Sequence, residues 1–373
     1  MTAVVLRPPV VRVRAAWLHV AGWWLFSRIV VMSAFGVLDA LGPRGYFGPR
    51  VFRHPLSLLD SWDGAWYRRV VEHGYLFVPG SQSDVAFFPG YPLLLRATGL
   101  PPRVAEPVVS NLALLIALIA FYELSAKLFD ADRARRATVF AAIAPAGFVY
   151  SMGYPSSLLF ALVCLAMLAA LGDAWLLATV FAAAAGLTRP DALAVVPPLA
   201  ALAWSRRHSL DPTRRGFALA AVLAAPAAIA SFAVYLRWAV GDAHAWSSDE
   251  ATWGRAFTLT GPAIAMRHVP AALLGHHAWL TRDTVALGLY AALLVVAKRV
   301  GVSWPWIISA LVVLVVPLFS GTVESEARFG LLALPVYWAL AAVSKRRMAG
   351  GTLRLLSLGL LVTLVVLTPY AWP

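Results

Sequence analysis

Long apolar stretches alternate with short polar or basic stretches along most of this chain. Several of them approach the roughly 20 residues that a helix needs to cross a membrane. A helix satisfies its own backbone hydrogen bonds and is therefore stable in lipid. The pattern predicts an all-α, polytopic integral membrane protein with about eleven transmembrane helices. The expected spans are residues 15–38, 105–129, 137–152, 155–171, 174–188, 191–204, 216–240, 283–297, 302–320, 328–343 and 352–369.

Two long polar segments interrupt this pattern, at residues 39–104 and 241–280. No soluble domain, low-complexity tract or short-period repeat is visible in the chain. We therefore expect one membrane-embedded domain over residues 1–373, with two long loops.

Composition supports the membrane interpretation. Of 373 residues, 61% are hydrophobic and 13% are charged, whereas soluble proteins have about 25% charged residues. The formal net charge is +13, but the basic residues cluster between spans. This distribution is typical of cytoplasmic loops and argues against a nucleic-acid partner.

The positions of the basic clusters predict the orientation. With the N-terminus in the cytoplasm, the clusters at 133–136, 206–215, 298–299 and 345–347 all fall on the cytoplasmic side. The first long loop also contains arginines, but long loops weigh little in this rule. Both long loops, and the links around Tyr154, Arg189 and Glu324, then lie on the outer face of the plasma membrane.

The single cysteine, Cys164, excludes an intramolecular disulfide and any cysteine-based metal site. The first apolar segment lacks a clean cleavage site, so we expect a retained span and not a signal peptide.

Residues 61–73 have the pattern of an amphipathic helix lying on the membrane surface, with Gly74 as its C-cap. Asp63, Tyr67 and the neighbouring apolar residues share one face. Asp63 could be a catalytic base, or only a first-turn acid favoured by the helix dipole, with Asp60 as N-cap. The aromatic residues Trp62, Tyr67, Tyr75, Phe88 and Tyr91 could contact substrate or anchor the loop at the interface.

Charged residues next to apolar spans form a second candidate group. Arg189, with Asp191 two positions on, could snorkel or could serve a buried site. Arg328 could bind an anion or could pair with Glu324 four positions earlier; Glu326 lies between them. Tyr154 could be only a span start. His73, His276 and His277 show no metal-ligand spacing.

The motif Trp62-Asp63-(x)2-Trp66-Tyr67-(x)6-Gly74-Tyr75, followed by Ala86-Phe87-Phe88-Pro89-Gly90-Tyr91-Pro92, resembles the first-loop signature of PIG-V-type mannosyltransferases. These belong to the GT-C class of multispanning glycosyltransferases. Later blocks resemble the family in the same order: residues 154–160, residues 187–191, and Arg328-Phe329 with Pro335 and Trp338. The first of these blocks differs from the eukaryotic pattern at Ser157 and Leu158.

The resemblance implies an inverting, mannosyltransferase-like hexosyltransferase that uses a polyprenyl-phosphate sugar, with Asp63 as the catalytic acid of the first loop. One carboxylate suffices as base because a lipid phosphate is already a good leaving group. Arg189 and Arg328 are the expected donor-phosphate ligands. Candidate substrate contacts are Trp62, Tyr67, His73, Tyr75, Phe88, Tyr91, Tyr154, Asp191, Glu324 and Glu326.

The expected partners are the polyprenyl-phosphate sugar, a lipid-linked or glycan acceptor, and membrane lipids. No cofactor is implied; a divalent cation near Asp60, Asp63 and Glu324 stays open because nothing in the spacing requires it.

A transporter or flippase for a lipid-linked sugar is the alternative; it predicts polar groups near the bilayer midplane and two pseudo-symmetric halves. A third possibility is a non-catalytic subunit of a transferase complex. The sequence does not distinguish mannose from another hexose or identify the acceptor.

Overall fold

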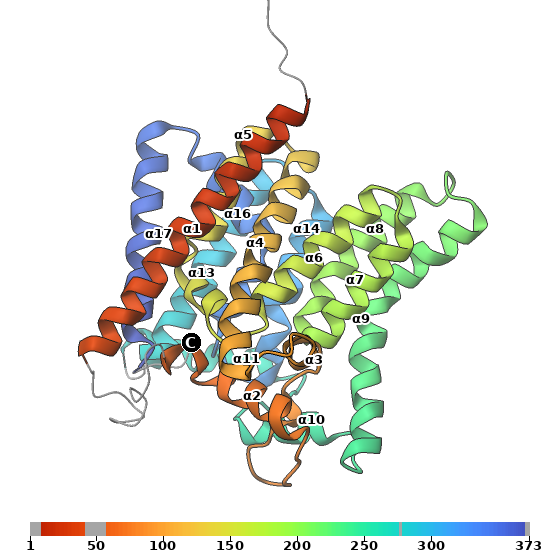
Figure 1. Ribbon diagram of the computed structural model, residues 1–373, viewed down its shortest axis with the longest axis vertical. Coiled ribbons are helices and arrows are strands. Elements are labelled where there is room, and N and C mark those ends of the chain that lie inside the picture. The colour runs from red at the N-terminus through yellow and green to blue at the C-terminus, as the bar shows by residue number, and fades with distance from the viewer. Residues whose placement is uncertain (1–8, 42–56, 276–277, 370–373) are drawn as a thin grey trace, which may run out of the picture.

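A computed structural model describes residues 9–41, 57–275 and 278–369, and the described residues form helices, turns and loops with no β-strand (Figure 1). The candidate histidines His276 and His277, and the arginines Arg44, Arg50 and Arg53 of the first long loop, lie outside these ranges. In the first half the helices, with η marking 3-10 helices, are α1 (Pro9–Leu41), η2 (Ser57–Asp60), α2 (Asp63–His73), η3 (Asp84–Ala86), α3 (Gly90–Ala97), α4 (Pro102–Leu128), α5 (Ala131–Ala142), η4 (Pro145–Ser151), α6 (Ser156–Leu171), α7 (Trp175–Thr188) and η5 (Pro190–Val195). In the second half they are α8 (Val196–Arg206), α9 (Pro212–Ala239), α10 (Ala245–Thr252), α11 (Gly261–Arg267), α12 (Val269–Leu273), α13 (Ala278–Arg299), α14 (Trp304–Val315), η6 (Pro317–Ser320), α15 (Glu326–Phe329), η7 (Gly330–Leu332), α16 (Leu334–Val343) and α17 (Arg347–Leu367).

Five helices in the described residues are long and apolar enough to cross a membrane: α1, α4, α9, α13 and α17. The count rises to seven if η4 with α6, and α15–η7 with α16, are each one bent span. The chain is therefore a multi-pass membrane protein, and the eleven spans expected from sequence are not all continuous helices. α7 has 14 residues and is about 21 Å long, shorter than the roughly 30 Å hydrocarbon core.

The helix breaks lie where the candidate site residues lie. Tyr154 occupies the 98° bend between η4 and α6. Arg328 belongs to α15, just before the 80° bend that leads into α16. Arg189 separates α7 from η5 and has an extended backbone, with φ −164°. Irregular backbone at membrane depth is tolerated where it is buried in protein or lines a cavity. The breaks thus bring polar residues into the protein interior.

The helices of the two polar segments gather at one end of the bundle. Figure 1 shows α2, α3 and α10 at this end, while α1 and α17 begin at the opposite end. Within the amphipathic pattern at 61–73, Asp63–His73 form the helix α2, and Gly74, with φ 78°, is its C-cap. Asp60 is not the N-cap, because the helix begins after Trp62.

Small residues allow the helices to approach closely. A Cβ on Gly186 of α7 would lie 2.5 Å from the carbonyl oxygen of Ala225 in α9. A Cβ on Gly153 would lie 3.2 Å from Cα of Gly64 in α2 and 3.0 Å from Cδ of Glu106 in α4. The close approach of Gly153 to Gly64 holds the first turn of α2 against the bend that contains Tyr154.

Substitution of Gly90 by alanine is expected to lower the free energy of unfolding by about 1–3 kcal/mol, because the added Cβ overpacks this contact. The Cβ would lie 2.8 Å from Oγ1 of Thr188 and 2.9 Å from the carbonyl oxygen of Leu187. Thermal unfolding in detergent micelles measures the effect. Gly351→Ala is the matched control, since its Cβ meets nothing within 4 Å. Equal melting temperatures for the two variants would contradict this packing.

Candidate active site

The N-terminus of α2 has an unusual backbone conformation. Trp62 has φ 57° and ψ −126°, a region that a bulky residue adopts only when its surroundings enforce it. Its indole nitrogen donates to the carbonyl oxygen of Thr368 at 3.2 Å, beyond the end of α17. This contact holds the turn that precedes Asp63.

Asp63 forms an ion pair and hydrogen bond with Arg328, 265 positions away in sequence. The side chains are only 13% and 6% exposed, respectively. The backbone N–H of Asp63 donates to the Tyr154 hydroxyl at 3.3 Å, and the Arg328 guanidinium lies 5.0 Å from the centroid of the Tyr154 ring. Arg328 thus pairs with Asp63 and not with Glu324, the local partner that spacing allowed. The pair joins the first polar segment to the helix break at α15.

A second strained residue supports the other side of this pair. Ser325 has φ 71° and directly precedes α15. Asp283, fully buried on α13, accepts from the backbone N–H groups of Ser325 and Ala327 at 2.9 and 3.0 Å. The Ser325 hydroxyl accepts from Arg255 at 3.0 Å and from Arg328 at 3.4 Å. Trp62 directly precedes Asp63, and Ser325 lies three positions before Arg328. Both have positive φ angles.

Three guanidinium groups surround one aromatic ring. Their distances to the centroid of the Phe329 ring are 5.0 Å for Arg189 and 5.5 Å for both Arg255 and Arg328. Arg189 also forms an ion pair with Asp191 at 2.6 Å and donates to the Ser156 hydroxyl at 3.3 Å. Within the described ranges, no carboxylate lies within 4 Å of the Arg255 guanidinium. This arrangement, which we call the Phe329 arginine cluster (Arg189, Arg255 and Arg328), concentrates donors suited to an anion.

Two acids lie beside this cluster. Glu326 is fully buried, and neither of its carboxylate oxygens has a hydrogen-bond partner in the part of the chain that the structure describes. Burial raises the pKa of Glu324, and the nearby Arg255 partly opposes this rise. Among the described residues, no three His, Cys, Asp or Glu side chains are grouped as metal ligands.

Tyr67 lies close to the ion pair. It is 5% exposed, and its ring packs edge-on against Phe87 and Tyr91, with centroids 5.1 and 5.4 Å away. Burial raises the pKa of its phenol; the nearby Arg189 partly opposes this rise, and Asp63 adds to it. Tyr67 is therefore one of the predicted aromatic residues that the fold brings to the Asp63–Arg328 pair.

Other predicted contact residues interact with groups outside the Asp63–Arg328 pair. Tyr91 is buried and bonds to Ser110 at 2.8 Å, and Phe88 packs on Phe232 with centroids 4.7 Å apart. His73 is 74% exposed at the far end of α2, roughly 15 Å along the helix from Asp63. Tyr75 donates to the carbonyl oxygen of Phe87 at 2.7 Å.

A mostly apolar cavity of about 290 Å³ lies between α2, α3, α7 and α9. Its polar lining residues are Tyr75, Arg96, Ser231 and Tyr235. Asp63, Arg189 and Arg328 do not line it. The cavity therefore neighbours the ion pair through α2 without including it.

No family model and no curated protein matches this chain by sequence. Its structure is similar to that of the archaeal oligosaccharyltransferase AglB from Archaeoglobus fulgidus, in complex with an inhibitory peptide and a dolichol-phosphate, with a TM-score of 0.50 and 13% identity. The match covers 94% of this chain and 56% of that chain. A structure of the oligosaccharyltransferase from the same organism, tethered with an acceptor peptide, gives a TM-score of 0.46 at 13% identity and covers 94% and 55% of the two chains. The fold is GT-C-like.

This chain thus spans little more than half the length of that enzyme. The likeness is one of fold, and it leaves the PIG-V-type family as a sequence resemblance.

Three charged residues that support the site, the buried Arg28 and Asp283 and the partly buried Arg255, were not singled out from sequence. Arg255 belongs to a polar segment with many solvated residues, and Asp283 follows Arg282 at a span boundary, so both have the local pattern of loop charges. Arg28 lies in the middle of α1, is 5% exposed, and donates to the Ser151 hydroxyl at 2.8 Å. Of these three residues, only Arg28 had a sequence signal, because a lone arginine inside an apolar span marks a buried or functional site. Arg28 holds η4, which leads into the bend at Tyr154.

Proposed function

We propose that this chain is an inverting glycosyltransferase that moves a hexose, with mannose as the first candidate, from a polyprenyl-phosphate donor to a lipid-linked glycan or another extracytoplasmic acceptor. The observation that carries the proposal is the nearly buried Asp63–Arg328 pair beside the Phe329 arginine cluster. It combines a base with an anion site, and these are the two elements that such a transfer requires.

Asp63 is the proposed base. The acceptor hydroxyl attacks the anomeric carbon, its proton passes to the Asp63 carboxylate, and the bond from that carbon to the phosphate oxygen breaks. The electron pair leaves with the polyprenyl phosphate. Attack on the face opposite the leaving group inverts the anomeric configuration.

Arg328, Arg255 and Arg189 are the proposed ligands of the leaving phosphate. The buried Nε of Arg328 has no acceptor among the described residues, and a phosphate oxygen would supply one. Among the described residues Arg255 has no carboxylate partner, so its positive charge is available to bind the phosphate. Fixed guanidinium donors at a partly dry site stabilise charge that develops on the leaving group.

We propose that the site faces outward from the plasma membrane, with the N-terminus in the cytoplasm. The basic clusters at 133–136, 206–215, 298–299 and 345–347 support this orientation. Purified protein in liposomes, supplied with labelled polyprenyl-phosphate mannose and an extract of lipid acceptors, tests the transfer directly. Absence of any transfer from polyprenyl-phosphate hexoses, with an intact folded protein, would refute the proposal.

Substitution of Arg189 by alanine is expected to raise KM for the donor about 10- to 100-fold, since a charge-assisted hydrogen bond contributes roughly 1.5–3 kcal/mol. KM for the acceptor should change much less. Steady-state kinetics with either substrate varied separates the two. Arg237→Ala, an exposed arginine at the end of α9, is the matched control. Unchanged donor kinetics in Arg189→Ala would refute its phosphate role.

A further inference from the structure

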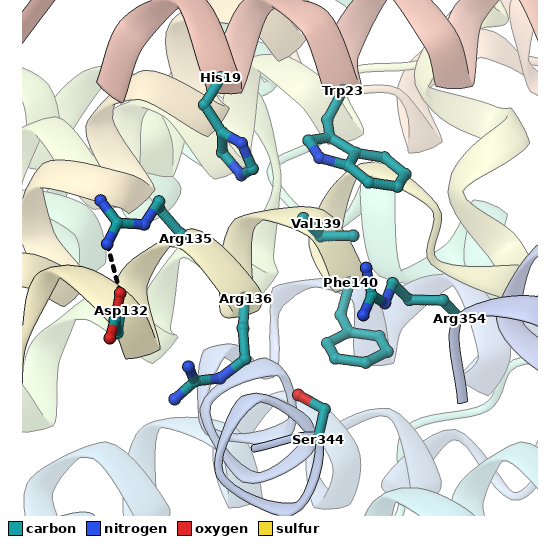
Figure 2. A pocket seen from close by; sticks show the side chains of 9 residues that line it. All are labelled: His19, Trp23, Asp132, Arg135, Arg136, Val139, Phe140, Ser344 and Arg354. Atoms are coloured by element: carbon teal, nitrogen blue, oxygen red, sulfur yellow. Dashed lines mark hydrogen bonds and ion pairs between the residues drawn. The ribbon is translucent and has the colours of Figure 1, made fainter. Parts of the chain in front are cut away.

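A second cavity is lined by residues of α1, α5 and α17 (Figure 2). In Figure 1, α1 and α17 begin at the end of the bundle opposite α2. The volume of the cavity is about 220 Å³. The nine lining residues come from α1, α5 and α17, with Ser344 just after α16: they are His19, Trp23, Asp132, Arg135, Arg136, Val139, Phe140, Ser344 and Arg354. We refer to it as the α1–α5–α17 pocket.

The pocket collects positive charge. Three of its residues are arginines, and its one carboxylate, Asp132, is paired with Arg135 (Figure 2). Arg136 and Arg354 each use Nε to donate to a backbone carbonyl, of Ala341 at 2.8 Å and of Gly350 at 2.9 Å. Within the described residues, neither has a carboxylate within 4 Å. Like charges that converge on one hollow repel each other unless an anion lies between them.

One further polar atom in the pocket has no partner. Nε2 of His19 is buried and makes no hydrogen bond to any described group, and Figure 2 shows the imidazole ring directed toward the centre of the pocket. Val139, Phe140 and Ser344 are buried residues of the lining, whereas Asp132, Arg135 and Arg354 are exposed. The pocket is therefore a hollow with a buried floor and a charged rim.

The size and surroundings of the pocket limit the ligand. Cavities for drug-sized ligands occupy roughly 300–1,000 Å³, so this smaller pocket suits a single compact anionic group. Apolar side chains on the flanking helices are widely exposed: Leu18 of α1 at 74% and Leu355 of α17 at 73%. Both helices are membrane-span candidates, so these side chains would face acyl chains.

We propose that the α1–α5–α17 pocket binds a phosphate group, with the headgroup of an anionic membrane phospholipid as the favoured source. Arg136 and Arg354 donate to the phosphate oxygens, because a guanidinium matches phosphate geometry with two parallel N–H groups. His19 supplies a further donor when its Nε2 is protonated. The acyl chains lie along the exposed apolar faces of α1 and α17. This proposal is independent of the transferase proposal, since it uses none of the same residues.

The test uses the full chain in detergent and follows lipid adducts by native mass spectrometry. The probes are dioleoyl-phosphatidylglycerol and dioleoylglycerol, which has the same chains without the phosphate. We expect a bound phosphatidylglycerol in the wild type that Arg136→Gln/Arg354→Gln weakens about tenfold or more, since charge-assisted hydrogen bonds are lost. Arg346→Gln/Arg347→Gln, with the same loss of charge at two exposed positions of the same end, should bind as the wild type does.

Further arms identify the source and keep the test decisive. A rise in melting temperature with inorganic phosphate, absent in the pocket variant and without phosphatidylglycerol adducts, would identify a free phosphate. Equal losses in the pocket and control variants, or equal binding of dioleoylglycerol, would overturn the proposal. If the double variant does not fold, Arg354→Gln alone should give a smaller loss of the same kind, because Arg354 is exposed; wild-type binding by it would overturn the proposal.

Discussion

Asp63→Asn is expected to reduce kcat for sugar transfer about 100- to 10,000-fold, because the amide cannot accept the acceptor's proton. The substitution preserves the size of the side chain and one oxygen that can still accept from Arg328. KM for the donor should therefore change little. Measurement of kcat with labelled polyprenyl-phosphate mannose, after the melting temperature confirms folding, gives the result.

Glu72→Gln is the matched control for this experiment. It makes the same change from carboxylate to amide on the same helix, at a side chain that is 41% exposed. It should retain full activity. Normal turnover by Asp63→Asn would remove Asp63 from the reaction and leave the ion pair with a structural role only.

Arg328→Met is expected to abolish transfer and to destabilise the protein by about 3–5 kcal/mol. The substitution leaves the Asp63 carboxylate with little solvent and without its partner, and an uncompensated buried charge is costly. Unfolding in detergent measures the stability, and the kinetic assay measures the loss of transfer.

A double-mutant cycle separates the pair from its two members. Asp63→Asn/Arg328→Met should regain part of the stability lost in Arg328→Met, because no buried charge then remains unpaired. It should stay inactive. Additive losses in stability would show that the two side chains do not interact in the native protein.

Local patterns predicted the helix over 61–73 and its end at Gly74, because amphipathic spacing and a left-handed glycine are properties of a short segment. The positive-inside rule also placed Asp63, Arg189 and Arg328 at one face, and the structure brings Asp63 to Arg328. The same rule did not distinguish a continuous span from a broken one. A connection at Tyr154 was predicted, but as a link between two complete spans, whereas the structure has a 98° bend between the short η4 and α6. An apolar run has the same composition whether its helix is straight or bent, so this bend and the 80° bend after α15 were not predicted.

The supports of the site were not predictable for a related reason. Asp283 holds the backbone at Ser325 across 42 positions, and Arg255 reaches Ser325 across 70. Neither contact has a signature within its own segment. The positive φ angle at Trp62 is likewise opposed to the local preference of a bulky residue. Tertiary contacts impose it, through the bond to Thr368.

The bond from Trp62 to Thr368 also has a consequence for biogenesis. The Asp63–Arg328 contact and the Trp62–Thr368 contact join positions 265 and 306 residues apart. Contacts of such sequence separation form late, because the intervening chain must first be ordered. A nascent chain whose ribosome has not yet released the segment around Thr368 therefore has an unsupported α2. Ribosome-arrested intermediates that lack the segment around Thr368 should therefore show no transfer activity.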